Sequence, residues 1–386
     1  MHVAHIEISG YRSIKKLAFP LARLNVFVGE NGVGKTNLYR GLELVQAAAQ
    51  GTLARELAAE GGMQSAMWTG ERRKHDEARI KLGVGLGARP EGANYTYRTE
   101  AGLVQQYRVE VGVKQPTGAG FLLEPQIKEE RLTFIGSKRP EILLERKGPM
   151  GYARDEEGVR QDLTSELFPS ETALAALKEP GRFPDLHAVR TTMLDWRFYH
   201  SFRTDRDAAL RQPCLAVTTP TLSSDGSDLA AVFATLAHIR QDTVDLDAAV
   251  DDAFPGARLV IPHPGRTASF FLVYREFPKR EFEAPELSDG TLRFLALAGA
   301  LLGYRLPRFI ALNEPETSLH PDLLPPLARL IARAAERTQV WVVTHSTILA
   351  DALAAAGRTK PRRVIKRNGE TLIEGLTLGG EFRDDD

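Results

Sequence analysis

The chain has 386 residues, of which 43% are hydrophobic and 26% charged, and its 50 basic residues equal its 50 acidic ones in number. The apolar fraction excludes a disordered protein, and the length predicts two domains or one domain with a large insertion. Zero net charge excludes a protein that holds nucleic acid through overall basicity, and the one cysteine, Cys214, excludes a disulfide framework or a cysteine-based zinc site. No signal peptide and no run of roughly 18 apolar residues is visible, so we expect a cytoplasmic protein without membrane attachment.

The first elements alternate apolar and polar residues as β-strands do. Strands are predicted at 3–8, 17–21 and 24–28. The third strand enters a glycine-rich loop, Gly29–Thr36, and a helix is predicted from Leu38 through Leu57, ended by Gly61 and Gly62.

The middle of the chain is richer in short strands separated by Gly and Pro. Strands are predicted at 80–84, 95–97, 107–111, 121–123 and 142–144, followed by a helix at 229–254 and strands near 259 and at 270–274. Helices at 291–302, 322–335 and 346–355 then alternate with strands at 309–312 and 340–343, and the tail has two short strands. We therefore predict an interrupted α/β fold with an N-terminal lobe at 1–77, a β-rich then helical insertion at 78–284 and a C-terminal lobe at 285–386.

The loop Gly29-Glu-Asn-Gly-Val-Gly-Lys35-Thr36 has the pattern G-x-x-x-x-G-K-[ST]. Its glycines let the backbone curl so that N–H groups face phosphate oxygens, and the following helix adds the positive end of its dipole. Lys35 is predicted to reach the β- and γ-phosphates, and the Thr36 hydroxyl to bind Mg²⁺. The alternative is an accidental glycine-rich turn, which the strand before the loop and the helix after it disfavour. The sequence therefore predicts a nucleoside triphosphate site.

A second polar cluster follows the predicted buried strand at 309–312. Asn313 and Glu314 stand at its carboxyl end, where open α/β sheets bind ligands. The amide oxygen of Asn313 can bind Mg²⁺ or a metal-bound water but brings no negative charge. Glu314 is the predicted general base for the attacking water. The alternative is a helix-capping Asn beside a surface Glu, which the phosphate loop upstream disfavours.

Four further segments carry a resemblance to a known family. They are Ile8-Ser-Gly-Tyr-Arg12-Ser13, Glu286-Leu-Ser288-Asp-Gly290, Asn313-Glu-Pro-Glu-Thr-Ser-Leu-His-Pro-Asp322 and Thr344-His345-Ser346. With the phosphate loop, they resemble the ABC-type ATPases of the RecF/SMC branch, specifically the small predicted ATPases grouped with AAA proteins. In that family the segments are a Phe/Tyr-Arg-Ser element, the signature motif, the Walker B segment with the D-loop, and the switch histidine. The resemblance covers residues 1–60 and 285–350 well and the middle loosely.

The resemblance implies a P-loop NTPase with an ABC-type, RecF/SMC-like head fold, a β-rich N-terminal subdomain and a mixed insertion, with ATP and Mg²⁺ as ligands. No coiled-coil arm is expected, because no long heptad pattern is present. The resemblance also implies a homodimer that forms on ATP binding, each subunit offering its signature motif to the partner's nucleotide. The predicted nucleotide-binding residues are Arg12, Ser13, Gly29, Asn31, Gly32, Gly34, Lys35, Thr36, Asn37, Ser288 and Gly290; the metal ligands are Thr36 and Asn313; and the catalytic residues are Glu314 and His345.

Two departures from the family pattern leave the activity open. Asp289 replaces the first signature glycine, and Asn313 replaces the usual Mg²⁺-binding aspartate. We predict an ATP-hydrolysing protein that acts in DNA repair or phage defence with an effector or nuclease as partner. The alternatives are a slow or non-hydrolysing nucleotide-sensing scaffold and a DNA-end-binding protein.

Two basic segments bear on DNA binding. Residues 196–206 interleave aromatics with arginines, which fits single-strand binding or a buried strand with arginines at its ends, and we favour the buried strand. Arg203 or Arg206 near the phosphates is a further option. The run 358–367 fits DNA contact and a solvated strand edge equally well.

Overall fold

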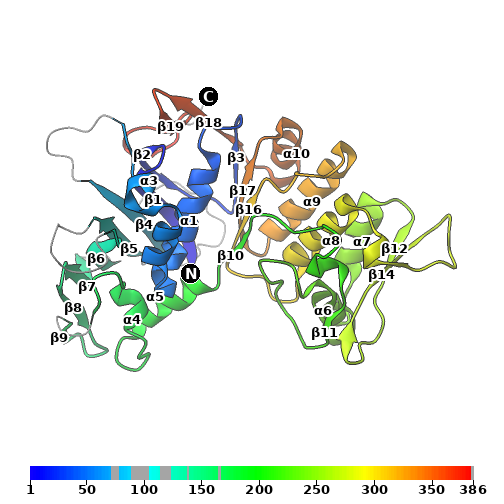
Figure 1. Cartoon of the computed structure of the whole chain (residues 1–386), viewed down its shortest axis with the longest axis horizontal. Coiled ribbons are helices and arrows are strands. Elements are labelled where there is room, and N and C mark those ends of the chain that lie inside the picture. Colours follow the sequence, from blue (N-terminus) through cyan, green and yellow to red (C-terminus); the bar gives the residue numbers. More distant parts are fainter. Residues whose placement is uncertain (71–77, 88–103, 114–122, 137–138, 164–166, 384–386) are drawn as a thin grey trace. The chain divides into compact units, whose positions relative to one another are not determined.

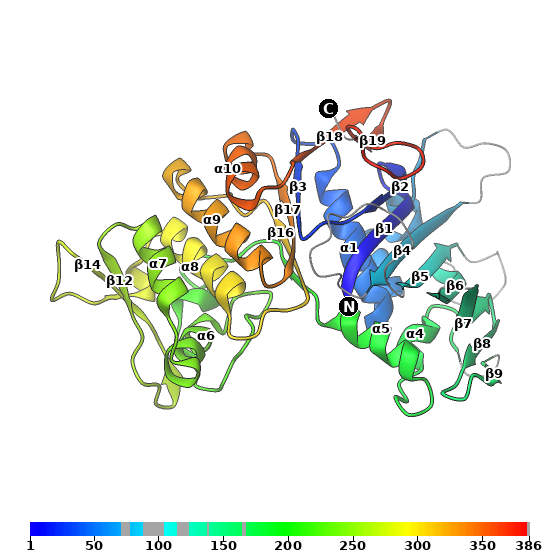
Figure 2. The same ribbon diagram turned by 180° about the vertical axis from the view of Figure 1, so that it is seen from behind.

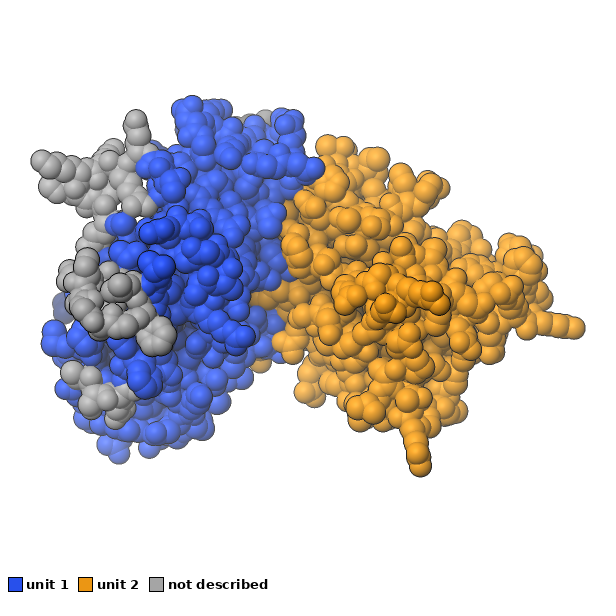
Figure 3. Space-filling model, in the orientation of Figure 1, with its two compact units in different colours: residues 1–22, 30–196, 363–386 blue, residues 23–29, 197–362 orange. Residues whose placement is uncertain are grey.

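A computed structural model describes residues 1–70, 78–87, 104–113, 123–136, 139–163 and 167–383. The chain divides into two compact units, each assembled from segments far apart in the sequence (Figure 3). Unit 1 comprises residues 1–22, 30–196 and 363–386, and unit 2 comprises residues 23–29 and 197–362. The three lobes at 1–77, 78–284 and 285–386 stay a prediction.

Unit 1 is built on an antiparallel sheet whose described strands run in the order β2-β1-β4-β5-β6-β7-β8-β9. Helix α1 packs on β1 and β4, and α5 lies beside α1 (Figure 1). The approach is so close that a Cβ on Gly41 of α1 would lie 2.4 Å from Ile8 Cδ1 of β1. The strands of the unit are β1 (His2–Tyr11), β2 (Ile14–Pro20), β4 (Arg79–Gly87), β5 (Val104–Gly112), β6 (Gln126–Ile135), β7 (Pro140–Lys147), β8 (Met150–Arg154) and β9 (Arg160–Asp162). Its helices are α1 (Lys35–Gln50), α2 (Leu53–Ala59), α3 (Gly62–Ala66), α4 (Ala173–Ala176) and α5 (Pro184–Leu194).

Unit 2 is built on parallel strands in the order β10-β16-β17-β3. Every residue of β16 and β17 is buried, as expected of parallel strands covered on both faces. Helix α9 contacts α8, α10 and β17, and α10 contacts β3, so the apolar core lies between these helices and the sheet (Figures 1 and 2). These strands are β3 (Leu24–Val28), β10 (Arg197–Tyr199), β16 (Phe309–Asn313) and β17 (Gln339–Thr344). The helices are α6 (Leu229–Ala234), α7 (Val244–Ala253), α8 (Asp289–Leu302), α9 (Leu324–Ala335) and α10 (Thr347–Gly357).

Smaller elements complete the described chain. A two-stranded sheet pairs β11 with β13, and a three-stranded sheet has the order β12-β14-β15. Strands β18 and β19 form an antiparallel hairpin near the end of the chain. The bounds are β11 (Cys214–Leu215), β12 (Ala257–Val260), β13 (Thr267–Ala268), β14 (Phe271–Tyr274), β15 (Phe282–Glu283), β18 (Arg362–Arg367) and β19 (Glu370–Ile373).

Two predicted helices are wrong in extent. The helix predicted through Leu57 ends at Gln50, because Gly51 adopts a left-handed φ of 84° and closes α1; α2 then follows as a separate helix. The helix predicted at 229–254 is interrupted after a π-helical turn, where Gln241 has a φ of 56° and α7 begins anew. The predicted strand at 95–97 lies outside the described residues, as do the first two residues of the one at 121–123.

Candidate functional site

The glycine-rich loop runs from the end of β3 to the start of α1. Gly29 donates its N–H to the Thr344 carbonyl oxygen at 3.3 Å, so the loop starts beside the end of β17. Gly32 and Gly34 have φ values of 80° and 100°, which only glycine adopts readily, and the side chain of Asn31 is exposed. A backbone curled in this way turns successive N–H groups toward an anion.

Lys35 begins α1 and folds back onto the loop. Its Nζ donates to the Glu30 carbonyl oxygen at 2.7 Å, and the residue is buried. The next side chain, Thr36, is exposed in the first turn of the helix. Among the described residues no side chain caps this helix at Gly34, so its positive end is available to a phosphate. The loop thus fits the predicted triphosphate.

A hydroxyl pair from outside the motif braces the loop. Thr371 Oγ1 donates to the Val33 carbonyl oxygen at 2.8 Å, and Ser13 Oγ lies 2.7 Å from the same Oγ1. Ser13 Oγ in turn accepts a hydrogen bond from Asn37 Nδ2 at 2.7 Å. A Cβ on Gly34 would lie 2.0 Å from Thr371 Oγ1, so only glycine fits there. The predicted residues Ser13 and Asn37 therefore hold each other beside the loop, and Thr371 is an addition to them.

Arg12 takes part in a different cluster. Its guanidinium contacts Glu60 Oε2 at 2.8 Å, and Glu60 also accepts hydrogen bonds from Tyr11 and Arg40. Burial and the neighbouring Glu60 carboxylate raise the pKa of Tyr11. The proposed contact of Arg12 with a nucleotide stays a prediction.

Asn313 ends β16 with a buried side chain. Its Nδ2 lies 3.0 Å from His200 Nδ1, at the end of the neighbouring strand β10. Its Oδ1 is buried and has no hydrogen-bond partner in the part of the chain that the structure describes. A buried oxygen of this kind is a fitting ligand for Mg²⁺ or for a metal-bound water. No group of three or more His, Cys, Asp or Glu side chains arranged for a metal occurs among the described residues. An Mg²⁺ held largely by phosphates and water needs only one or two protein ligands.

Glu314 and Glu316 stand in different environments although two positions apart. Glu314 has a φ of 46° and donates its N–H to the Val343 carbonyl oxygen at 2.7 Å, and its side chain is half-buried. Glu316 is 7% exposed. His345 Nδ1 lies 3.7 Å from Glu314 Oε1 and 3.2 Å from Glu316 Oε1. The two predicted catalytic side chains, Glu314 and His345, are therefore neighbours at the carboxyl ends of β16 and β17.

Glu316 organises the turn that carries His345. Its Oε1 accepts hydrogen bonds from the hydroxyl of Thr344 and from the N–H groups of His345 at 2.9 Å and Ser346 at 3.3 Å. Burial lowers the pKa of Arg293, and the attraction of the Glu316 carboxylate opposes that effect. Glu316 therefore orients the predicted switch histidine.

The predicted signature segment forms the start of α8. Ser288 caps this helix, its Oγ accepting from the Thr291 N–H at 3.1 Å, and both Ser288 and Asp289 are exposed. A Cβ on Gly290 would lie 3.2 Å from the Ser318 carbonyl oxygen, so glycine permits close passage of the two backbones.

Arg211 fixes the approach to that helix. Its buried guanidinium donates to the carbonyl oxygen of Leu287 at 2.8 Å and to Asp289 Oδ1 at 2.6 Å, and also to the carbonyl oxygens of Thr204, Ala284 and Pro285. The aspartate that replaces the first signature glycine is therefore an anchor for this arginine.

A family model described as "AAA domain, putative AbiEii toxin, Type IV TA system" matches residues 24–351. The chain belongs to this family. The match spans the loop at Gly29, the signature segment, Asn313 and His345, and the predicted grouping with the AAA-type ATPases is thereby confirmed. No curated protein sequence is significantly similar to the chain.

Two solved structures show the same fold as this family member. One is a crystal structure of the SmcHead bound to the C-winged helix domain of ScpA, with 14% identity, a TM-score of 0.55, and coverage of 98% of this chain and 99% of that chain. The other is the Smc head domain with an extended coiled coil bound to the C-terminal domain of ScpA, derived from Pyrococcus furiosus, with 13% identity, a TM-score of 0.52, and coverage of 98% and 97%. The predicted fold class is confirmed, and no coiled-coil arm is evident in the described residues of this chain.

In this AAA-domain chain, the segment that could have bound single-stranded nucleic acid has buried aromatic side chains, whereas its Arg203 and Arg206 are exposed. Residues 197–199 form β10, and Trp196, Phe198, Tyr199 and Phe202 are buried. Arg203 pairs with Asp205 at 2.9 Å. The favoured alternative, a buried strand with arginines at its ends, is therefore the one observed. The other basic run, 358–367, includes β18.

Three residues at the site carry no motif and were missed by sequence reasoning. They are His200 beside Asn313, Thr371 beside the loop, and Arg211 beside Asp289. A conserved position in related sequences is the signal that could have found them, since each lies far along the chain from the residue it supports.

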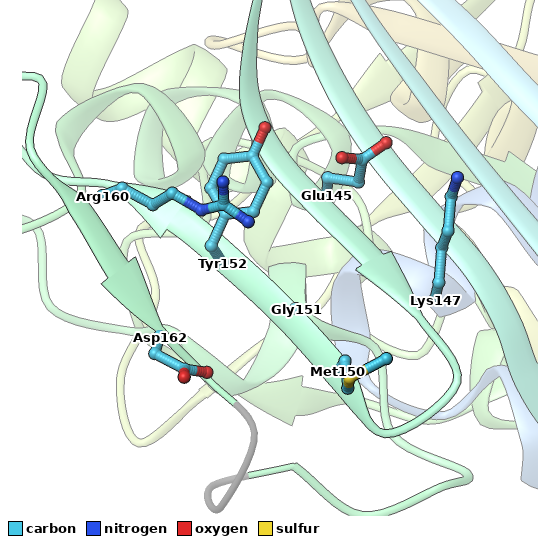
Figure 4. Close-up of a pocket in the computed structure, with 7 residues that line it drawn as sticks. All are labelled: Glu145, Lys147, Met150, Gly151, Tyr152, Arg160 and Asp162. Carbon is cyan, nitrogen blue, oxygen red and sulfur yellow. The ribbon is translucent and has the colours of Figure 1, made fainter.

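A surface cavity of about 540 Å³ in unit 1 lies apart from these motifs in the sequence. Its lining comes from β7, β8 and β9, and the Arg160 guanidinium covers the ring of Tyr152 at 3.6 Å from the centroid (Figure 4). None of the predicted site residues lines it. In the described chain no helix is both long and apolar enough to cross a membrane.

Proposed function

We propose that this chain binds ATP with Mg²⁺ and hydrolyses it. The observation that carries the proposal is the set of polar side chains at the carboxyl ends of β16 and β17, where Asn313, Glu314 and His345 meet, in a chain whose phosphate loop opens α1. Thr36 and Asn313 would hold Mg²⁺, which neutralises phosphate charge. Lys35 would bind the β- and γ-phosphates, and Glu314 would take the proton of the attacking water while His345 orients it.

The phosphate-loop assignment is tested with Lys35→Ala. The variant loses the one side-chain charge that the motif directs at the phosphates, so we expect binding of a fluorescent ATP analogue and ATP turnover to be abolished. Arg23→Ala, which removes an exposed cation that bonds the Glu336 carbonyl oxygen, is the control and should bind normally. Full affinity and turnover in Lys35→Ala would refute the assignment.

We further propose that ATP joins two copies of the chain through the start of α8. The exposed Ser288, with the N–H groups of the first helical turn, suits a phosphate of the partner subunit's nucleotide. Glu314→Gln should slow hydrolysis, leave ATP bound and trap this dimer. Size-exclusion chromatography with ATP and Mg²⁺ is the measurement, and a variant that stays monomeric at all concentrations would argue against the dimer.

A second candidate function is a nucleotide-sensing switch that hydrolyses ATP slowly. The neutral amide of Asn313 favours it, because no charge from this position supports the cation. Asn313→Asp should then lower the Mg²⁺ requirement and raise the turnover rate. If the site is instead tuned around a neutral ligand, the added charge should raise the pKa of Glu314 and slow the reaction. Superimposable rate curves against Mg²⁺ for the two proteins would remove Asn313 from the metal site.

We place this activity in DNA repair or phage defence in the cytoplasm, with an effector or nuclease as partner and DNA as a further ligand to test. Two findings support a partner: the family description names a type IV toxin–antitoxin system, and both solved SMC heads are bound to ScpA domains. Co-purification of the tagged chain with the products of neighbouring genes, with and without ATP, tests the proposal. Recovery of the chain alone in both conditions would contradict it.

A further inference from the structure

The residue that ends β16 differs from an aspartate in one respect that matters to a cation. A carboxylate presents two equivalent oxygens, whereas the amide of Asn313 presents one oxygen and one NH₂ group. Only the oxygen can bind Mg²⁺ or accept from a metal-bound water, and an NH₂ group turned toward the cation would repel it. An asparagine here therefore needs a neighbour that fixes the direction of its amide.

The end of β10 supplies that neighbour. Tyr199 lies opposite Leu312 in the parallel register, so His200 and Asn313 follow at the ends of adjacent strands. The 3.0 Å contact joins Asn313 Nδ2 to His200 Nδ1. An amide NH₂ group only donates, so Nδ1 is the acceptor in this contact.

The same contact determines where the amide oxygen goes. With Nδ2 held by the imidazole, Oδ1 occupies the opposite side of the amide, buried and without a hydrogen-bond partner among the described residues. A buried polar atom left in this way is unfavourable until a ligand completes it. The imidazole thus directs the oxygen away from itself and keeps it open to a ligand.

We propose that His200 is a positioning residue, which holds the Asn313 amide with its oxygen directed at the metal or at a metal-bound water. The inference rests on the proposed Mg²⁺–ATP function and adds one residue to it. Neighbours that orient a metal ligand typically change metal affinity by 10- to 100-fold, so the effect is measurable.

The first experiment measures how Mg²⁺ promotes binding of a fluorescent, non-hydrolysable ATP analogue. His200→Ala should raise the half-saturating Mg²⁺ concentration by about 10-fold and leave analogue binding in EDTA unchanged. His200→Asn, whose Oδ1 can stand in for Nδ1, should restore most of the loss. His263→Ala is the control, since His263 is an exposed histidine that stacks on His238.

The second experiment separates orientation from general support by repeating the comparison in Asn313→Asp. The two oxygens of a carboxylate are equivalent, so its orientation does not need to be fixed. His200→Ala in the Asn313→Asp protein should therefore leave the Mg²⁺ requirement unchanged or lower it. Because His200 is exposed, its truncation leaves no core cavity and should lower the free energy of unfolding by no more than the cost of one Asn313 NH₂ group left unpaired. Every variant should therefore stay folded at the assay temperature, which thermal unfolding without nucleotide checks.

Two results would overturn the inference. One is a His200→Ala protein with the wild-type Mg²⁺ dependence. The other is an equal loss on His200→Ala in the wild-type protein and in the Asn313→Asp variant, which would show a merely structural role. Failure of the proposed function looks different, because the wild-type protein would then either not bind the analogue or bind it without any dependence on Mg²⁺.

Discussion

Replacing Glu316 tests whether its buried carboxylate, and not the half-buried one of Glu314, holds the turn that carries His345. In Glu316→Ala three donors lose their acceptor, but the Ser346 N–H keeps a second one, Thr344 Oγ1 at 3.0 Å. The loss therefore falls on the His345 N–H and the Thr344 hydroxyl. Each buried donor left unpaired costs about 1–3 kcal/mol, and Arg293 loses an attractive charge, so we expect about 4 kcal/mol of destabilisation. That is a large part of the roughly 5–15 kcal/mol available to a typical protein.

The assay is urea unfolding at pH 7, followed by circular dichroism and tryptophan fluorescence. Glu316→Gln keeps an acceptor oxygen but loses the charge, so it should cost about 1–2 kcal/mol, since charge-assisted hydrogen bonds are roughly twice as strong as neutral ones. Glu314→Gln is the matched control and should change the free energy of unfolding by less than about 0.5 kcal/mol while slowing turnover. A loss below about 1 kcal/mol in Glu316→Ala, or an equal loss in Glu314→Gln, would refute the division of roles.

Three further outcomes are expected. Gly34→Ala should lower the free energy of unfolding by at least about 1–3 kcal/mol and weaken analogue binding, because residue 34 has a φ of 100° and the added Cβ would clash with Thr371 Oγ1. Unchanged thermal unfolding would contradict this. Arg211→Ala should lower the free energy of unfolding, measured by urea denaturation, by about 3 kcal/mol, because buried carbonyl oxygens lose their donor. Asp289→Asn, at the 61% exposed partner of Arg211, should lower it by less than about 1 kcal/mol. Burial lowers the pKa of His5 to about 4, so between pH 6.5 and 4 the unfolded chain binds a proton that the folded chain does not. The free energy of unfolding of the wild type should therefore fall by up to about 3 kcal/mol over this range, and His5→Asn should lack this fall. Parallel curves of unfolding free energy against pH for the two proteins would refute this.

The parts of the candidate site that could be predicted are those made of residues that are neighbours in the sequence. The phosphate loop and the predicted signature, Walker B and switch segments are short stretches of chain, so each can be recognised without knowledge of the fold. Their flanking strands and helices could also be predicted, because β16 and β17 contain the continuous apolar runs 309–312 and 340–343 and α9 has a clear apolar face.

The remaining parts depend on contacts between distant segments. His200 reaches Asn313 only because β10 pairs with β16, and Thr371 reaches Val33 only because the tail returns to the loop. Helix ends were also missed: one glycine, Gly51, ends α1 although the apolar pattern continues into α2. A periodic pattern shows which face is buried but not where the backbone turns.

The position of β3 in the chain has a consequence for biosynthesis. Its partner β17 pairs Phe27 with Val343, yet about 310 residues separate the two strands. At translation rates of about 5–20 residues per second, the apolar strand Leu24–Val28 waits roughly 15–60 seconds for β17 to be made. Most of unit 1 is synthesised during that interval. The described strands of its antiparallel sheet all belong to unit 1, so this sheet can form before β17 is made. Early folding of that sheet would shorten the span that β17 must close, and any truncation before residue 339 would leave β3 without this partner.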